Sequence, residues 1–329
     1  MTQVLPVKQK IKMSILEISE QACHLASSRG FISISVDRKE IHKVPFDHVT
    51  SIITRAHGIT YTHNLLVKLA KYNIPLVITD QSFMPVAITT PISVHHQHNK
   101  VLGAQMGQSM ANKNKMWQTI VKSKIRQQIV ALEYLKIAAP SLQNLVAEVT
   151  AGDKKNIEAQ AARLYWNLLF GKDFKRSRFG TTPNEMLNYG YTIFRSTIAR
   201  FICASGLHPA LGIKHHNQYN AFCLADDLIE PYRPLIDICV YKLLAGGEHE
   251  LSPQIKKILA KQLEQKLRVG KKWLTVEDSI KKLCQSLAKA LKNQTLGLKL
   301  PKANMKRLNF TDMENETIRI PNNVDGGNV

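Results

Sequence analysis

The stretch Pro85-Val-Ala-Ile-Thr-Thr-Pro-Ile-Ser-Val-His-His-Gln-His-Asn-Lys100 separates two patterns of side chains, and the fold class follows from the difference between them. Before it, apolar and polar residues alternate with period two, or β-branched residues follow one another, as is typical of strands. After Pro91 and a polar link, apolar residues recur with the period of an α-helix. The sequence therefore predicts an α+β protein, in which a small β-rich N-terminal domain precedes a larger all-α C-terminal domain.

The predicted elements divide the chain into four parts. Residues 1–92 form the β-rich domain, 93–100 the linker and 101–308 the helical domain. Residues 309–329 contain Asn, Glu and Gly without an apolar period, which predicts a mobile tail. Strands are predicted at 31–36, 49–54, 75–79 and 85–90, a helix beginning after Thr62, and further helices at about 104–150, 153–170, 183–204, 217–245, 252–269 and 275–293.

The charge of the chain restricts its function more than any other bulk property. Its 329 residues include 45 Lys+Arg and 25 Asp+Glu, so the formal net charge is +20. A polycation of this size is typical of proteins that bind nucleic acid or an anionic membrane surface. Residues 251–300 are net +9, whereas residues 201–250 are net −3. An acidic segment inside a protein that binds phosphates indicates a metal-ion site, because like charges packed together require a compensating cation.

Several classes of protein are excluded. No stretch is apolar enough to cross a bilayer, and the N-terminus lacks the pattern of a secretory signal. No Gly-rich Lys loop of the Walker type is present, so no nucleotide triphosphate is implied. The cysteines are odd in number and scattered, without Cys-x-x-Cys, which argues against a disulfide framework or a zinc ribbon and for a reducing cytoplasm. They are Cys23, Cys203, Cys223, Cys239 and Cys284.

A carboxylate on a largely apolar helical stripe is the first candidate for chemistry. Within Asn156-Ile-Glu-Ala-Gln-Ala-Ala-Arg-Leu-Tyr-Trp166, Glu158 shares one face with Ala162, Tyr165 and Leu169. Burying a carboxylate costs free energy unless the group is paired or binds a metal. Glu158 is therefore either ion-paired in the core or a metal ligand, and its spacing alone favours the ion pair.

An acidic helical turn is the second candidate. In Asp226-Asp227-Leu-Ile-Glu230, the side chains of Asp227 and Glu230 lie at i and i+3 and face the same way. Hard divalent cations prefer oxygen ligands of this kind. The alternative is an acidic face that is paired with Arg233 or with a lysine elsewhere.

A loop with two glycines and a proline, Gly206-Leu-His-Pro-Ala-Leu-Gly-Ile-Lys-His-His216, comes before the acidic turn. We expect it to bring His215 or His216 toward the helix that carries the carboxylates. Two adjacent histidines are not a metal motif by themselves. If one of them is a ligand, a site of mixed imidazole and carboxylates suits Mn²⁺ and also accepts Mg²⁺.

Basic residues expected to contact nucleic acid lie in two regions. The loop Lys172-Asp-Phe-Lys-Arg-Ser-Arg-Phe179 combines four cations with two phenylalanines, which suits contacts to a phosphate backbone and to a base. The segment 252–293 has a dense lysine face, although any single lysine there fits an ordinary solvated surface. The residues that we predict to bind DNA are Lys172, Lys175, Arg176, Arg178, Lys256, Lys257, Lys271 and Lys272.

With these motifs placed in order, the chain resembles the CRISPR spacer-acquisition integrase, the first of the two universal adaptation proteins. The resemblance spans about residues 15 to 305 and is strongest with members from type II systems, which act beside single-protein effector nucleases. The strings that carry it are Ala161-Ala-Arg-Leu-Tyr-Trp-Asn-Leu-Leu-Phe-Gly171, Leu187-Asn-Tyr-Gly-Tyr191, Gly206-Leu-His-Pro-Ala-Leu-Gly-Ile-Lys-His215 and Leu224-Ala-Asp-Asp-Leu-Ile-Glu-Pro-Tyr-Arg-Pro234.

The resemblance implies a set of metal ligands. The family's glutamate corresponds to Glu158, its histidine to His215 and its final acidic ligand to Glu230. Many relatives have two aspartates where this chain has Asp227 and Glu230, which makes Asp227 the candidate for a fourth ligand. Glu158, His215 and Glu230 are the expected catalytic residues, with Mg²⁺ or Mn²⁺ as the metal.

The resemblance also implies the reaction and the partners. A 3′-hydroxyl of captured foreign DNA attacks a phosphodiester at the edge of a CRISPR repeat, with an associated endonuclease activity. The implied partners are double-stranded DNA, both protospacer and repeat, and a second copy of the chain that pairs through the N-terminal domain. A small ferredoxin-like adaptation protein completes a heterohexamer, and the RNA-guided effector nuclease and accessory adaptation proteins are further partners.

Two other functions remain open from the residues alone. A metal-dependent nuclease that cuts DNA without joining it would use the same ligands. A non-catalytic DNA-binding scaffold would have an acidic island that serves only as an ion-paired surface. The scaffold leaves the ordered glutamate, histidine and acidic turn unexplained, so we favour the integrase.

Overall fold

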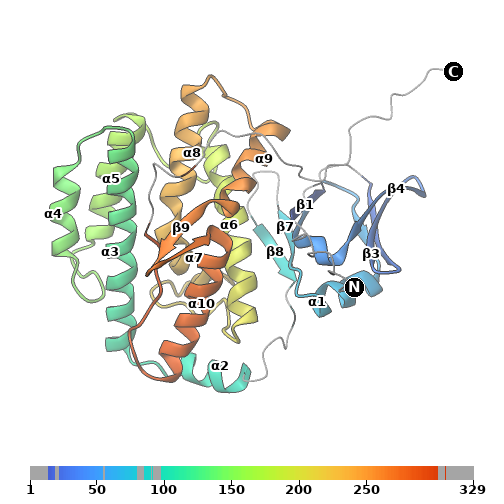
Figure 1. Cartoon of the computed structure of the whole chain (residues 1–329), viewed down its shortest axis with the longest axis horizontal. Helices are drawn as coiled ribbons and strands as arrows, with labels where there is room; N and C mark the ends of the chain where they lie inside the picture. The colour runs from blue at the N-terminus through green and yellow to red at the C-terminus, as the bar shows by residue number, and fades with distance from the viewer. Residues whose placement is uncertain are drawn as a thin grey trace, which may run out of the picture.

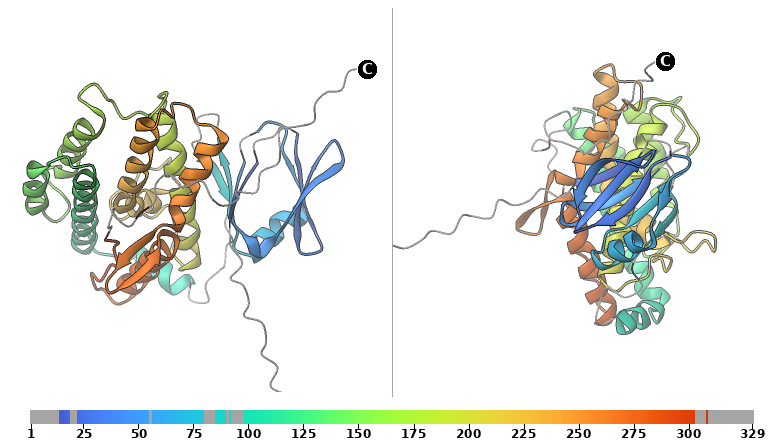
Figure 2. Two further views of the ribbon diagram at one scale, coloured as in Figure 1. Left: turned by 45° about the horizontal axis from the view of Figure 1, so that its top comes forward. Right: turned by 90° about the vertical axis from the view of Figure 1, so that its right-hand side faces the viewer.

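The N-terminal strands form two four-stranded sheets at one end of the molecule (Figures 1 and 2). The computed structural model describes residues 14–18, 22–54, 56–79, 85–89, 91, 98–302 and 308. In order across the first sheet lie β1 (Ser14–Ile18), β5 (Val49–Thr54), β7 (Leu76–Thr79) and β8 (Pro85–Thr89), parallel except for β8. In order across the second lie β4 (Lys39–Pro45), β3 (Phe31–Val36), β2 (His24–Ser28) and β6 (Thr60–Tyr61).

The strands predicted at 31–36 and 49–54 are confirmed, and those at 75–79 and 85–90 are confirmed to within one residue at either end. The helix after Thr62 is α1 (His63–Lys71), and the Thr62 hydroxyl caps it by accepting a hydrogen bond from the N–H of Leu65. The short turn η1 (Phe46–His48) links β4 to β5. The prediction missed β1, β2, β4 and β6, which are either short or irregular in their alternation.

In the first sheet β5 and β7 are buried on both faces, which explains their continuous runs of β-branched residues, whereas the edge strand β8 is largely exposed. Successive side chains of a strand point to opposite faces. Ile52 of β5 accordingly packs with α1 and the second sheet, whereas its neighbour Ile53 packs with the helices that follow. In β7, Leu76 likewise packs with α1 and the second sheet, and its neighbour Val77 packs with the helices. This sheet therefore contributes to two cores at once.

The rest of the described chain is mainly helical and extends away from the sheets (Figure 1). None of its helices is long and apolar enough to cross a membrane, in any part of the chain that the structure describes. All five cysteines are buried, and none of them forms a disulfide. The elements are α2 (His98–Met106), α3 (Met110–Tyr134), α4 (Pro140–Glu148), α5 (Ile157–Phe170), α6 (Asn184–Ala204), α7 (Cys223–Ile229), η2 (Glu230–Tyr232), α8 (Arg233–Ala245), α9 (Pro253–Lys261), η3 (Gln262–Glu264), β9 (Lys266–Val269), β10 (Lys272–Thr275) and α10 (Val276–Lys292).

Two long predicted helices are divided in the structure. The stretch 104–150 is three helices, because Pro140 begins α4 and disfavours a helical conformation for the residue before it. The stretch 217–245 begins with a loop, in which Asn217 and Asn220 each accept a hydrogen bond from a backbone N–H two residues later. Pro231 and Pro234 then interrupt the helical ladder between α7 and α8.

The expectation of an all-α second part is wrong in one place. The helix predicted at 252–269 ends at Lys261, and β9 pairs with β10 as an antiparallel hairpin. Polar and apolar residues alternate along β9, and Gly270 has a positive φ at the turn. The linker residues 98–100 belong to α2, whereas 93–97 and the tail 309–329 lie outside the described residues. The domain boundaries stay a prediction.

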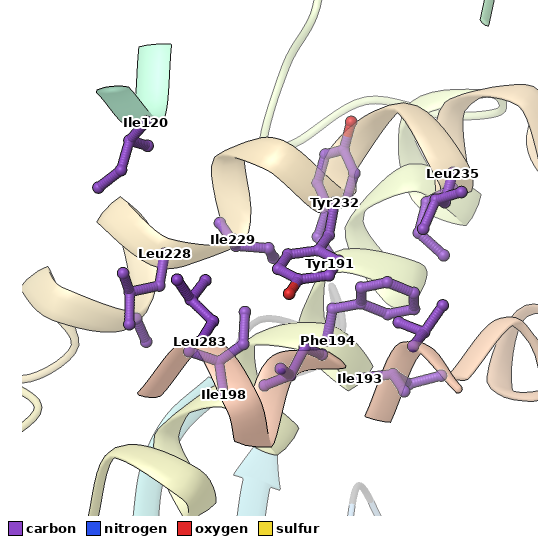
Figure 3. Close-up of a cluster of buried hydrophobic side chains, with 14 of the residues drawn as sticks. Ile120, Tyr191, Ile193, Phe194, Ile198, Leu228, Ile229, Tyr232, Leu235 and Leu283 are labelled. Atoms are coloured by element: carbon purple, nitrogen blue, oxygen red, sulfur yellow. The ribbon is translucent and has the colours of Figure 1, made fainter. Parts of the chain in front are cut away.

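The helical core is arranged around α6, which is buried along most of its length. Figure 3 shows Tyr191, Ile193, Phe194 and Ile198 of this helix among side chains from α3, α7, α8 and α10. One charged residue connects this core to the strands. Glu17 of β1 accepts hydrogen bonds from the Tyr189 hydroxyl at 2.7 Å and from Lys256 Nζ at 2.9 Å.

The close approach of α6 and α8 depends on Gly190. A Cβ at this position would lie 2.6 Å from Cγ2 of the fully buried Ile236. Overpacking of this kind costs about 1–3 kcal/mol, while the gain in helix propensity returns only about 1 kcal/mol. We expect Gly190→Ala to lower the free energy of unfolding by up to about 2 kcal/mol in chemical denaturation.

Gly103→Ala is the matched control, because Gly103 lies within α2 and a Cβ there meets no atom within 4 Å. It should raise stability by about 0.5–1 kcal/mol. An equal effect of the two substitutions would contradict the packing argument.

Candidate active site

Two of the predicted ligands, Glu158 and Glu230, share one cation. Lys124 lies in the middle of α3, and its Nζ is 2.6 Å from Glu158 Oε1 and 2.6 Å from Glu230 Oε2. Glu158 is in the first turn of α5 and Glu230 begins η2, so the ammonium joins three elements. Burial lowers the pKa of Lys124, but the charges of Glu230 and Glu158 outweigh it and leave the pKa raised. Lys124 is therefore a cation at neutral pH.

Glu230 is the more deeply buried carboxylate of the pair, with only 5% of its surface exposed. Its Oε1 accepts a hydrogen bond of 2.9 Å from Nε of Arg233, one turn later on α8. Burial raises the pKa of Glu230, but Arg233 and Lys124 overcome that effect and hold the pKa at about 2. Glu230 is consequently ionised at neutral pH, as a metal ligand has to be.

The first turn of α5 is held by a carboxylate that the sequence did not single out. Asp153 accepts hydrogen bonds from the backbone N–H groups of Ile157 and Glu158, both at 2.9 Å. Asn156 adopts a left-handed conformation between them, with φ 52°. The negative charge at the start of the helix also suits the helix dipole. Asp153 thereby determines where Glu158 enters the site.

Asp227 uses its whole carboxylate to hold the histidine loop. It is fully buried, and its Oδ2 accepts from the N–H groups of Ile213 at 2.5 Å and Lys214 at 3.0 Å. Its Oδ1 accepts from the N–H of His215 at 3.2 Å and lies 2.8 Å from the ring Nδ1 of His215. A carboxylate has about four lone-pair positions, and these four donors occupy them. We therefore assign Asp227 to positioning His215 rather than to direct metal ligation.

This loop folds over Asp227 only because residue 212 is glycine. A Cβ on Gly212 would lie 2.1 Å from the carbonyl oxygen of His215 and 2.9 Å from Asp227 Oδ2. No rearrangement of side chains relieves a contact with a backbone oxygen at that distance. The glycine that precedes the histidine by three residues is thus required by packing.

His215 is oriented with one ring nitrogen available. A carboxylate only accepts, so Nδ1 donates to Asp227 and Nε2 is left for a metal ion. The hydrogen bond raises the pKa of His215 above its ordinary value, although partial burial acts in the opposite direction. The ring meets Trp117 of α3 edge-on, with centroids 5.8 Å apart. Trp117 lies two turns before Lys124, so α3 contacts all three predicted ligands through these two side chains.

The residues fit a divalent cation in type and in charge. They comprise two carboxylates and an imidazole, and Glu230 Oε2 is buried without accepting a hydrogen bond of ordinary geometry, although it faces Lys124. Among the described residues, no three acidic, histidine or cysteine side chains are gathered closely enough to enclose a metal ion. The ammonium of Lys124 takes the position between the two glutamates.

Comparison with known proteins identifies the family. The sequence profile of the family described as CRISPR associated protein Cas1 matches residues 16–269. The chain is 36% identical over 267 residues to the CRISPR-associated endonuclease Cas1 of Neisseria meningitidis serogroup C (strain 8013), covering 80% of this chain and 88% of the relative. The chain belongs to the Cas1 family. The resemblance inferred from the sequence motifs, including the likeness to type II members, is confirmed.

Solved structures agree with this Cas1 fold. A casposase bound to an integration product superposes with a TM-score of 0.76 at 18% identity, covering 92% of this chain and 96% of that chain. A Cas6-RT-Cas1–Cas2 complex gives a TM-score of 0.70 at 20% identity, covering 91% of this chain and 37% of the longer one. At these identities the likeness shows a shared fold.

The basic residues predicted to bind DNA differ in their exposure in this Cas1-family chain. Lys172, Lys175 and Arg178 are exposed on the loop after α5, and Lys271 and Lys272 are exposed at the β9–β10 turn, while Lys257 is partly exposed. Arg176 is directed inward. Its guanidinium donates to Asn184 Oδ1 at 2.9 Å and to Asn188 Oδ1 at 2.7 Å.

Lys256 is a correction to the prediction. It is 8% exposed and its ammonium pairs with Glu17, so it packs α9 against β1 instead of lining an open surface. The helical lysine pattern did not reveal this, because the partner lies 239 residues away in the sequence.

A buried network lies behind Glu230. The Arg233 guanidinium lies 4.5 Å from the Tyr191 ring centroid, and that of Arg176 lies 5.2 Å from it. The hydroxyls of Tyr191 and Tyr165 donate to the two oxygens of Asp237, which is 1% exposed. Burial raises the pKa of Asp237 to about 7, against the two tyrosine hydrogen bonds. This network holds Arg233 in place and connects the basic loop to the site.

Sequence reasoning missed Lys124 and Asp153 as parts of the site. Lys124 had a visible signal, because it lies on the apolar stripe of Trp117, Ile120 and Ala131, where an unpaired charge would be costly. For Asp153 the sequence contained no such signal beyond the position of this residue shortly before a predicted helix. Arg233 was considered only as an alternative partner for the acidic turn, and it does pair with Glu230.

Replacing Asp227 should disorganise the histidine loop. Asp227→Asn puts an amide group where backbone N–H groups need an acceptor, and buried donors left without one cost about 1–3 kcal/mol each. We expect a loss of roughly 2–4 kcal/mol of stability, together with a lower His215 pKa in an NMR titration of the metal-free protein. Asp173→Asn, at an exposed aspartate, should change neither. An unchanged titration in the Asp227 variant would contradict the assignment.

Asp237 should make stability depend on pH. Its pKa is raised from 3.8 to about 7 in the folded protein, so the fold binds a proton that the unfolded chain has lost. The stabilisation is complete below about pH 4 and is lost as the pH rises through about 7, by roughly 2–4 kcal/mol. Asp237→Asn should flatten this slope in denaturant titrations between pH 5 and 8. An unaltered slope would show that the carboxyl is ionised in the fold.

Proposed function

We propose that this Cas1-family chain is the integrase of CRISPR adaptation and that Glu158, His215 and Glu230 carry its chemistry with Mg²⁺ or Mn²⁺. The observation that supports this most directly is the convergence of the two glutamates, from different helices, on one buried cation position. Asp227, one turn before Glu230, holds His215 through its ring Nδ1. Its curated relative with 36% identity is a CRISPR-associated endonuclease.

The reaction exchanges one phosphodiester for another. The 3′-hydroxyl oxygen of the captured DNA forms a bond to phosphorus at the edge of a repeat, the bond to the existing 3′ oxygen breaks, and the hydroxyl proton ends on that leaving oxygen. The number of phosphodiesters is conserved, so no nucleotide triphosphate is consumed. A divalent cation held by the three ligands would supply Lewis-acid stabilisation of the charge that develops on the phosphate.

The chain's own residues prepare the site for that step. Lys124 and Arg233 keep Glu230 ionised, and Asp227 keeps Nε2 of His215 available. The exposed cations Lys172, Lys175 and Arg178 lie on the loop that follows the last turn of the Glu158 helix, and we propose that they contact phosphates of the DNA at a distance from the ligands. His215 keeps close to half of its side chain exposed, so this residue is accessible to a DNA backbone.

The partners follow from the family and from the fold match to a chain in a Cas1–Cas2 complex. Double-stranded DNA and a Cas2 protein are the expected partners. In finer detail, we propose a homodimer formed through the N-terminal sheets and two such dimers around a small Cas2 dimer. Contacts with an effector nuclease and accessory adaptation proteins belong to the same proposal.

A strand-joining assay tests the function. Purified protein is incubated with Mn²⁺ or Mg²⁺ and a branched DNA that mimics a half-integrated fragment, and joined strands are measured as the reaction runs backwards. Glu158→Ala should reduce joining by a hundredfold or more, on the order expected when a metal ligand is lost. Glu148→Ala, at an exposed glutamate on α4, is the matched control and should join DNA like the wild type.

The products separate the alternatives. Shortened strands without joining would favour a nuclease. Tight DNA binding without any reaction calls for repeating the assay with the Cas2 partner, and continued inactivity there would favour a scaffold.

A further inference from the structure

Lys124 contacts both glutamates through the oxygens that a shared metal ion would use. Its ammonium lies 2.6 Å from Glu158 Oε1 and from Glu230 Oε2, whereas Arg233 takes the other oxygen of Glu230. Mg²⁺ binds carboxylate oxygens at about 2.1 Å. A divalent ion held by these two carboxylates would therefore compete with the ammonium for the same space, and the two positive charges would repel.

The two cations beside Glu230 differ in their freedom to move. Arg233 is confined by its hydrogen bond to Oε1 and by the Tyr191 ring 4.5 Å away. The side chain of Lys124 is 10% exposed, and its polar contacts among the described residues are the ion pairs with the two glutamates. A four-carbon stem allows an ammonium to move by rotation about single bonds. Glu158 is 23% exposed at the side chain, so the outer side of this pair is open to solvent.

The charges make some cation necessary at this point. Glu230 is 6% exposed at its side chain, and two adjacent carboxylates without a cation between them would repel in a medium of low dielectric. The ammonium relieves that repulsion, with one unit of positive charge where a metal ion would bring two. It therefore stabilises the arrangement of α3, α5 and η2 while the ligands wait for metal.

We propose that Lys124 is a built-in competitor for the metal site: it neutralises Glu158 and Glu230 in the metal-free protein and is displaced when a divalent cation binds. This inference rests on the proposed metal site. It implies that the chain keeps its site assembled without metal and that it lowers its own metal affinity in doing so. Removing the ammonium should therefore tighten metal binding while weakening the metal-free fold.

The test measures metal affinity in the full-length protein without DNA. Free Mn²⁺ is counted by electron paramagnetic resonance in titrations of wild type, Lys124→Met and Lys124→Gln. Both variants should bind Mn²⁺ at least tenfold more tightly than the wild type. Lys122→Met is the matched control, since it removes the same charge two residues earlier on α3 at a partly exposed position, and it should bind within about twofold of the wild type. Adding Glu158→Gln should abolish the tight binding.

Thermal unfolding supplies a second readout. In EDTA, Lys124→Met should unfold at a lower temperature than the wild type, because Glu158 loses its cation and Glu230 keeps only Arg233. Saturating Mn²⁺ should raise its unfolding temperature by more than it raises that of the wild type. If Lys124→Met fails to fold in EDTA, folding on addition of Mn²⁺ would support the proposal, and no folding with metal would overturn it.

The outcomes separate this inference from the proposed function. If the wild type binds Mn²⁺ and both Lys124 variants bind it with the same affinity, Lys124 does not compete with the metal. That result would overturn the inference and leave the proposed metal site intact. Weaker binding in the variants would show that Lys124 assists the ligands, which also overturns it. Absence of Mn²⁺ binding in every protein, including the Lys124 variants, would overturn the metal site itself and the inference with it.

Discussion

Glu230 is a carboxylate that has to stay ionised inside a helical core, and much of the site's geometry follows from how it is neutralised. Lys124 reaches it from α3 and Arg233 from α8, and each of these cations makes one further contact. Lys124 shares its charge with Glu158, and Arg233 packs on Tyr191. In a medium of low dielectric these pairings are strong, and breaking one leaves an uncompensated charge. The relative positions of α3, α5, η2 and α8 are thus coupled to one buried negative charge.

The histidine is placed by a different device. Asp227 lies one turn before Glu230, yet it does not pair with a lysine or an arginine. It accepts three hydrogen bonds from backbone N–H groups of the histidine loop and a fourth from the His215 ring. Gly212 allows the backbone to approach closely enough for that arrangement. Two adjacent turns of the chain therefore differ in their contacts, since Asp227 orients an imidazole and Glu230 pairs with two cations. This division explains how a short acidic motif organises both sides of the site.

The fold connects this site to the remainder of the molecule through buried polar links. Glu17 of β1 pairs with Lys256 of α9 and accepts from Tyr189 of α6, so the first strand is tied to the helical core. The first sheet adds Ile53 and Val77 to that core from its second face. Tyr191 belongs to the same buried helix, where Figure 3 shows it among the apolar side chains. The catalytic elements consequently rest on a core that both parts of the chain build.

The sequence by itself determined that a β-rich part precedes a mainly helical one, and it indicated the family and the residues that we propose as ligands. Period-two alternation predicted β3, Thr62 predicted the start of α1, and the motifs around Glu158, His215 and Glu230 indicated the family. These features depend on local spacing or on strings of adjacent residues, which a single sequence displays directly. The same local patterns merged α2, α3 and α4 and hid the β9–β10 hairpin, since apolar period alone does not mark where a helix ends.

Only the tertiary structure decided which charges meet. Lys124 is 34 residues from Glu158 and Lys256 is 239 residues from Glu17, so no spacing rule connects either pair. Asp227 and Glu230 look equivalent on a helical turn, but the loop that folds over one of them gives them different roles. Burial and long-range pairing set the energies of these charges, and both arise only when separate segments pack together. The ligands can therefore be named from the sequence, whereas the cation that lies between them cannot.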